Sequence, residues 1–197
     1  MNGAQATNAA LKEWAIVCQA LADGRQTLLI RKGGIQEIKD GFEVTHRNFW
    51  LFPTYVHQKA TDLVPTVHEE FRAIQAAEPP PGILPIRLYA TVEYMIRVAD
   101  LARLRGLADQ HVLSWDCVAA RFHYRNKPGV HLLVVRVYRR PEAFLLPQKN
   151  WYEGCVSWVD LDQTISPDGC TPVLSDAEFA VRAAGIHEKA SGDGLAT

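Results

Sequence analysis

The sequence contains no hydrophobic run that approaches the roughly 18 to 20 residues needed to span a bilayer. Its first eight residues have neither a basic stretch nor an apolar stretch, so we expect no secretory signal, no membrane partner and a cytoplasmic location. The four cysteines form no C-x-x-C pair, and the seven histidines share no ligand spacing on one predicted element. We therefore expect free thiols and no metal site.

Several catalytic sequence motifs are also missing. Gly33-Gly34 belongs to neither a dinucleotide-binding nor a P-loop glycine pattern, and no G-x-S-x-G elbow is present. His68-Glu69-Glu70 lacks the second histidine of a zinc-protease helix, and Asp160-Leu-Asp162 lacks the glycine and distal glutamate of a calcium-binding loop. These absences disfavour the corresponding enzyme and binding classes.

Acidic residues are absent from Cys117–Pro141, a segment that carries six Lys/Arg and two His. Residues 1–141 hold 18 Lys/Arg against 13 Asp/Glu, whereas residues 142–197 hold 3 against 9. The net charge of −1 argues against strong indiscriminate binding to nucleic acid. A local basic face is compatible with this balance.

The length of 197 residues fits one domain with a full core, which we place at residues 8–187 and follow with a disordered tail at 188–197. Helices are predicted at residues 8–22 and 66–77, after Asp100, from Ser114 to Arg121 and after the capping box Ser175–Glu178; strands are predicted at residues 27–31, 42–44, 49–52, 86–98, 130–138, 144–146 and 156–161. Regular β-α-β alternation is missing, so we predict an α+β fold with a strongly curved mixed sheet, or a small open β-barrel, and flanking helices. The strand at 86–98 is long enough that we expect it to bend or bulge.

The segment Trp50–Gln58 combines aromatic rings with polar side chains on a predicted strand end and loop. Tyr55, His57 and Gln58 supply a phenol, an imidazole and an amide, which suit recognition of a planar polar ligand such as a base. The alternative is an aromatic loop that packs on the core.

Two basic segments are candidates for contacts with phosphate. Arg31 and Lys32 precede Gly33-Gly34, where backbone N–H groups can approach an anion. Arg121 and Arg125 begin a run of cations interleaved with aromatic residues, a pattern typical of binding to single strands or flipped bases. The alternatives are a plain turn in the first segment and a solvated helix end in the second.

A third set has the spacing of a D…E-x-K nuclease. Asp23 and Glu37 would bind Mg²⁺, and Lys39 would help to position the attacking water. Such triplets also arise by chance in a charged sequence. The strand that would carry them is very short here, because it lies between Gly-Gly and Asp-Gly pairs.

Several short motifs together carry a family resemblance. They are Leu11-Lys-Glu-Trp14, the stretch from Gly24 to Ile35, Phe52-Pro-Thr-Tyr-x-His-Gln58, Leu113-Ser-Trp115, Arg121-Phe122 and Val135-Arg-Val-Tyr138. Over about residues 10 to 161 the sequence resembles the prokaryotic family called domain of unknown function 1802. The resemblance implies a link to DNA processing, because some members are associated with restriction-type nuclease domains.

A fainter likeness is to PUA-like modules of the ASCH and EVE groups. Gly24-Arg25-Gln26 and Arg31 occupy the places of a turn and an arginine-bearing strand in those modules. This likeness implies a small curved barrel that binds RNA or modified bases.

Taken together, these patterns predict a non-catalytic module that binds DNA or RNA, with a modified or flipped base as the recognised feature, and that needs no cofactor. The first alternative is the Mg²⁺-dependent nuclease described above. The second is a protein-interaction subunit whose acidic C-terminal third meets a basic partner.

Overall fold

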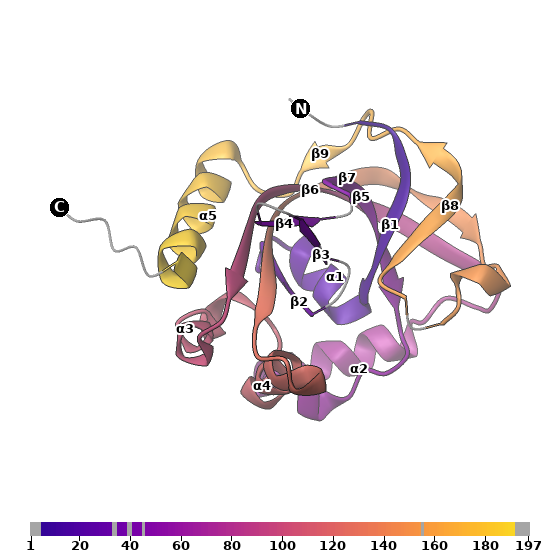
Figure 1. The fold of residues 1–197 in the computed structure, drawn as a ribbon. Helices are drawn as coiled ribbons and strands as arrows, with labels where there is room; N and C mark the ends of the chain where they lie inside the picture. Colours follow the sequence, from indigo (N-terminus) through magenta and orange to yellow (C-terminus); the bar gives the residue numbers. More distant parts are fainter. Residues whose placement is uncertain (1–4, 33–34, 39–40, 45, 155, 192–197) are drawn as a thin grey trace.

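A computed structural model describes residues 5–32, 35–38, 41–44, 46–154 and 156–191 (Figure 1). Its main sheet has seven strands in the order β2-β7-β6-β5-β1-β8, with β9 paired to β7. The strands are β1 (Thr7–Trp14), β2 (Leu28–Arg31), β5 (Asn48–Thr54), β6 (Ile83–Val98), β7 (Val130–Pro147), β8 (Trp158–Ile165) and β9 (Thr171–Pro172). A separate pair consists of β3 (Ile35–Ile38) and β4 (Gly41–Val44). The strands β1 and β5 run parallel and their neighbours pair antiparallel, so the sheet is mixed as predicted.

The helices flank this sheet. They are α1 (Ala15–Ala22), α2 (His68–Ala76), α3 (Leu101–Arg105), α4 (Trp115–His123) and α5 (Asp176–Ser191), with short 3-10 helices η1 (Ala60–Asp62), η2 (Pro65–Val67), η3 (Ala108–Gln110), η4 (Tyr124–Asn126) and η5 (Asn150–Tyr152). The predicted α+β class with an open curved sheet and flanking helices is confirmed. The expected domain boundary at residue 188 falls inside α5, which continues to Ser191 and buries Ala190. No helix among the described residues is long and apolar enough to cross a membrane.

The curvature of the sheet arises mainly in the long pair β6 and β7. The register between them shifts at Ile86/Leu88 and again at Val92/Tyr94. The first shift leaves Arg87 of β6 and residues 140–143 of β7 outside the ladder, and the second leaves Glu93 of β6 outside it. Such bulges bend a strand and increase its twist. The predicted bend of the long strand is therefore confirmed.

Alternation along β5 divides the core in two, because successive side chains of a strand point to opposite faces. Phe49 and Leu51 join the larger core, to which each of α1 to α5 contributes buried side chains. Trp50 and Phe52 join a smaller core built from β1, β5, β6, β7 and β8. The aromatic residues of β5 thus pack on both faces of the sheet.

Two sequence predictions are wrong, one at β1 and one at β7. The helix predicted at 8–22 begins only at Ala15, because residues 7–14 form β1 between β5 and β8. Burial of Ala9, Ala10 and Leu11 and pairing on both sides outweigh the helix propensity of this stretch. Residues 144–146 are not a separate edge strand but the far end of β7, paired with β6.

Candidate functional site

A cavity of about 600 Å³ lies where the parallel strands β1 and β5 end. Their register pairs Glu13 with Pro53 and Trp14 with Thr54, so both carboxyl ends reach the same edge of the sheet. The chain leaves this edge through α1 on one side and through the Tyr55 loop on the other. The cavity is also lined by residues that lie between β7 and β8, namely Gln148, Lys149, Tyr152, Glu153, Gly154 and Val156.

The structure brings four predicted site residues together in this cavity, although they come from distant parts of the sequence. Arg31 enters from the end of β2, and Arg121 enters from α4. Tyr55 and His57 follow the end of β5, and His57 is exposed with a left-handed backbone φ of 60°.

The other basic and polar candidates do not line the cavity. The Lys32 ammonium donates hydrogen bonds to the carbonyls of Phe122 at 3.2 Å and Gly129 at 2.6 Å. Burial lowers the pKa of Lys32, and the nearby charges of Arg97 and Lys127 lower it further. Lys32 thus holds the chain that follows α4.

Arg125 and Gln58 also lie outside the cavity lining. Arg125 is exposed on η4, where its guanidinium lies 5.2 Å from the Tyr124 ring centroid. Gln58 donates to the carbonyl of Thr54, and its buried Oε1 has no hydrogen-bond partner among the described residues. Gly33 and Gly34 are outside the described residues.

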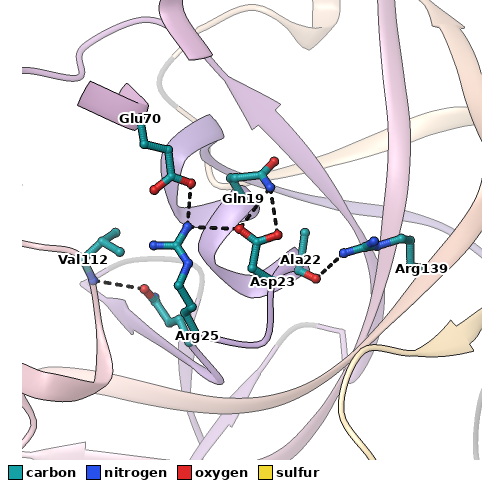
Figure 2. A network of polar contacts seen from close by, with 8 residues as sticks. Gln19, Ala22, Asp23, Arg25, Glu70, Val112 and Arg139 are labelled. Atoms are coloured by element: carbon teal, nitrogen blue, oxygen red, sulfur yellow. Dashed lines mark hydrogen bonds and ion pairs between the residues drawn. The ribbon is translucent and has the colours of Figure 1, made fainter. Parts of the chain in front are cut away.

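No contact among the described residues brings Asp23, Glu37 and Lys39 of the nuclease alternative together. Asp23 ends α1, and its carboxylate accepts hydrogen bonds from Gln19 at 2.9 Å and from Arg25 at 3.1 Å (Figure 2). Glu37 lies on β3, but its side chain and the whole of Lys39 are outside the described residues, so this alternative stays a prediction. Within the described ranges no group of three or more His, Cys, Asp or Glu gathers to hold a metal ion.

A buried ion pair in the cavity wall escaped the sequence analysis. Arg31 Nη1 donates to Glu13 Oε2 at 2.8 Å, and the two side chains are only 12% and 3% exposed. Arg31 also donates to the carbonyl of Lys12 at 3.2 Å, while Glu13 Oε1 accepts the backbone N–H of Trp14 at 2.9 Å. The available signal was the lone carboxylate of Glu13 in the mostly apolar stretch 9–17. A helix at 8–22 would place this carboxylate opposite Leu11, Trp14 and Cys18, on a solvated face.

Arg121, the other arginine of this cavity, is also fixed in place. The Arg121 guanidinium lies 4.8 Å from the Trp14 ring centroid and donates to the carbonyl of Ile30 at 2.8 Å. Such a stack holds the cation and the indole face together. Burial raises the pKa of Tyr55, and the nearby carboxylate of Glu78 raises it further, so its phenol stays protonated at neutral pH and can donate a hydrogen bond.

The cavity lining is mixed in charge and rich in aromatic rings. Its basic residues are Lys12, Arg31, Arg121 and Lys149; its acidic residues are Glu13, Glu78 and Glu153; its rings are Trp14, Phe52, Tyr55, His57 and Tyr152. The volume is within the roughly 300 to 1,000 Å³ typical of small-ligand sites. Donors, acceptors and ring faces are therefore available together to one planar polar group.

Comparisons with known proteins identify a family and some distant structures. The sequence matches the profile of the family described as "Domain of unknown function (DUF1802)" over residues 10–185. No curated protein matches the chain. The crystal structure of ASCH from Zymomonas mobilis is 11% identical, with a TM-score of 0.43 over 89% of this chain and 93% of that chain. A mutant of the same protein is 11% identical, with a TM-score of 0.42 over 89% and 96% of the two chains.

Proposed function

We propose that this chain, which belongs to the DUF1802 family, is a nucleic-acid-binding protein that takes an unpaired base into the cavity at the ends of β1 and β5. The observation that carries the proposal is the convergence of Arg31, Arg121 and Tyr55 on this cavity beside Trp14. Aromatic faces and guanidinium groups are the side chains that bind unstacked bases in a sequence-tolerant way.

Each group has a distinct role in the proposed complex. Tyr55 and Trp14 provide ring faces for stacking, and the Tyr55 hydroxyl provides a hydrogen-bond donor. Glu13 has acceptor capacity left on each carboxylate oxygen, which suits an exocyclic amino group of a base. A modified base would be distinguished by the extra volume and polar atoms that it brings into the cavity.

The test is fluorescence anisotropy with labelled single-stranded and double-stranded DNA and RNA, at low and moderate salt with EDTA. Loss of a stacked base costs about 1–3 kcal/mol, so Tyr55→Ala is expected to weaken binding roughly 5- to 150-fold. Tyr124→Ala is the matched control, because Tyr124 is exposed and lies outside the cavity lining.

The outcomes separate the candidate functions. Absence of binding at low salt would overturn the proposal, and so would equal losses in the two tyrosine variants. Strand breaks that require both Mg²⁺ and Glu37 would instead support the nuclease alternative with Asp23 and Lys39.

A further inference from the structure

A second cavity of about 460 Å³ adjoins the first. The two share Pro53 and Tyr55 in their linings, so they meet at the end of β5. The second is formed by α1, by the end of α2 and by the facing parts of β6 and β7, where Arg87 and Arg139 lie. Figure 2 shows one of its sides, with Arg139 next to the end of α1.

Arg87 is the cation best placed to bind a ligand in the second cavity. It lies at the first register shift of β6, between the pairs Ile86–Phe144 and Leu88–Arg139. A bulge residue is not held in the ladder and can point its side chain away from the regular alternation. Arg87 is exposed, and its guanidinium makes no hydrogen bond or ion pair with another residue in the described part of the chain.

The charges around Arg87 leave this cavity cationic. Arg139 donates one hydrogen bond to the carbonyl of Ala22, which leaves other N–H groups of its guanidinium available. Asp23 is the acid in the lining, and it is already bound by Arg25, which also pairs with Glu70 (Figure 2). The anion favoured here is one that accepts several N–H donors, as a phosphate does.

We infer that the second cavity binds a backbone phosphate of the same strand whose base occupies the first cavity, so that the ligand is a single-stranded segment of at least two nucleotides that passes over Tyr55. This inference rests on the proposed function. A paired base cannot enter the first cavity without leaving its partner, which excludes an intact duplex. A free nucleoside carries no phosphate, so in the first cavity it leaves Arg87 without a ligand.

The experiment measures competition by a nucleoside, a dinucleotide and an eight-nucleotide strand against a labelled single strand, with separate DNA and RNA series. The wild type is expected to bind the dinucleotide and the longer strand at least about tenfold more tightly than the nucleoside. Arg87→Ala is expected to weaken binding of the dinucleotide and the longer strand about 5- to 10-fold and to leave binding of the nucleoside unchanged. The salt slope for the longer strands should fall by about 0.7, the value for one phosphate contact on a single strand. Arg72→Ala is the control, because Arg72 is exposed on α2 and lines neither cavity.

Failure of this inference and failure of the proposed function give different results. If the eight-nucleotide strand binds, but the nucleoside binds equally well and Arg87→Ala has no effect, the role of the second cavity is overturned while base binding stands. If no oligonucleotide binds at low salt, both are overturned. Comparison of the DNA and RNA series shows which of the two nucleic acids supplies the phosphate.

Discussion

Replacing Glu13 by alanine tests the ion pair in the wall of the first cavity. The substitution leaves the Arg31 guanidinium, which is 12% exposed, with the Lys12 carbonyl at 3.2 Å as its remaining described partner. It also removes the acceptor of the Trp14 backbone N–H. A largely buried charge and a partly buried donor therefore lose their partners in one change.

The expected loss of stability follows from this geometry. Removal of one member of a buried ion pair typically costs about 3–5 kcal/mol. Arg31 keeps one hydrogen bond and some solvent contact, so we expect about 3 kcal/mol for Glu13→Ala, near the lower limit. Glu13→Gln keeps the shape and one acceptor oxygen, and we expect a loss of about 1.5 kcal/mol. For a chain of this length, 3 kcal/mol corresponds to a decrease in Tm of roughly 6–12 °C.

The assay is urea unfolding at pH 7, followed by tryptophan fluorescence and by circular dichroism. Glu153→Ala is the matched control, because Glu153 lines the same cavity but is exposed, and we expect its effect to stay within about 0.5 kcal/mol. If Glu13→Ala unfolds at the same urea concentration as this control, the ion pair does not stabilise the cavity wall and our reasoning is refuted.

Three further predictions concern the scaffold. Burial lowers the pKa of His111 to about 4, so below its ordinary value of 6.5 the unfolded chain binds a proton that the folded chain does not. Between pH 7 and pH 4 the free energy of unfolding in urea should therefore fall by about 3 kcal/mol more in the wild type than in His111→Asn. Equal decreases in the two proteins would contradict this prediction. Gly24→Ala should cost about 1–2 kcal/mol in the same assay, since φ is +68° and the new Cβ would lie 2.7 Å from Leu174 Cδ2; an unchanged midpoint would contradict it. Ser175→Ala should cost about 1 kcal/mol, because Ser175 Oγ accepts the Glu178 N–H at 3.3 Å as the cap of α5; equal stability of variant and wild type would show that the cap is dispensable.

The long strands were the most predictable part of the fold. Period-two alternation over residues 86–98 and the apolar run from Val130 correctly indicate β6 and β7, since these patterns reflect burial on one or both faces. The resemblance to DUF1802, based on short motifs, is confirmed over residues 10–185. Periodicity failed at β1, because Leu11 and Trp14 continue the helical spacing of Cys18 in α1 although residues 7–14 pair as a strand.

The wrong helix prediction at 8–22 also concealed the part of the candidate site that β1 contributes. Residue types and their neighbours in the sequence identified Tyr55, His57, Arg31 and Arg121 as candidates, and the fold places these four around one cavity. Their neighbours on β1 were missed, because a helix at 8–22 would put Glu13 on a solvated face. Parallel pairing of β1 with β5 depends on contacts about 40 residues apart, which local patterns in one sequence do not encode.

The most direct test of the account is to locate the bound base. A single-stranded oligonucleotide that carries one photoreactive base, 5-iodouracil, is bound at low salt, irradiated and mapped by peptide mass spectrometry. We predict crosslinks at the cavity rings Trp14, Phe52, Tyr55 and Tyr152, and their loss at the Tyr55 position in Tyr55→Ala. Crosslinks confined to residues outside the cavity, such as the exposed Tyr124, would contradict the central claim that this cavity holds the base.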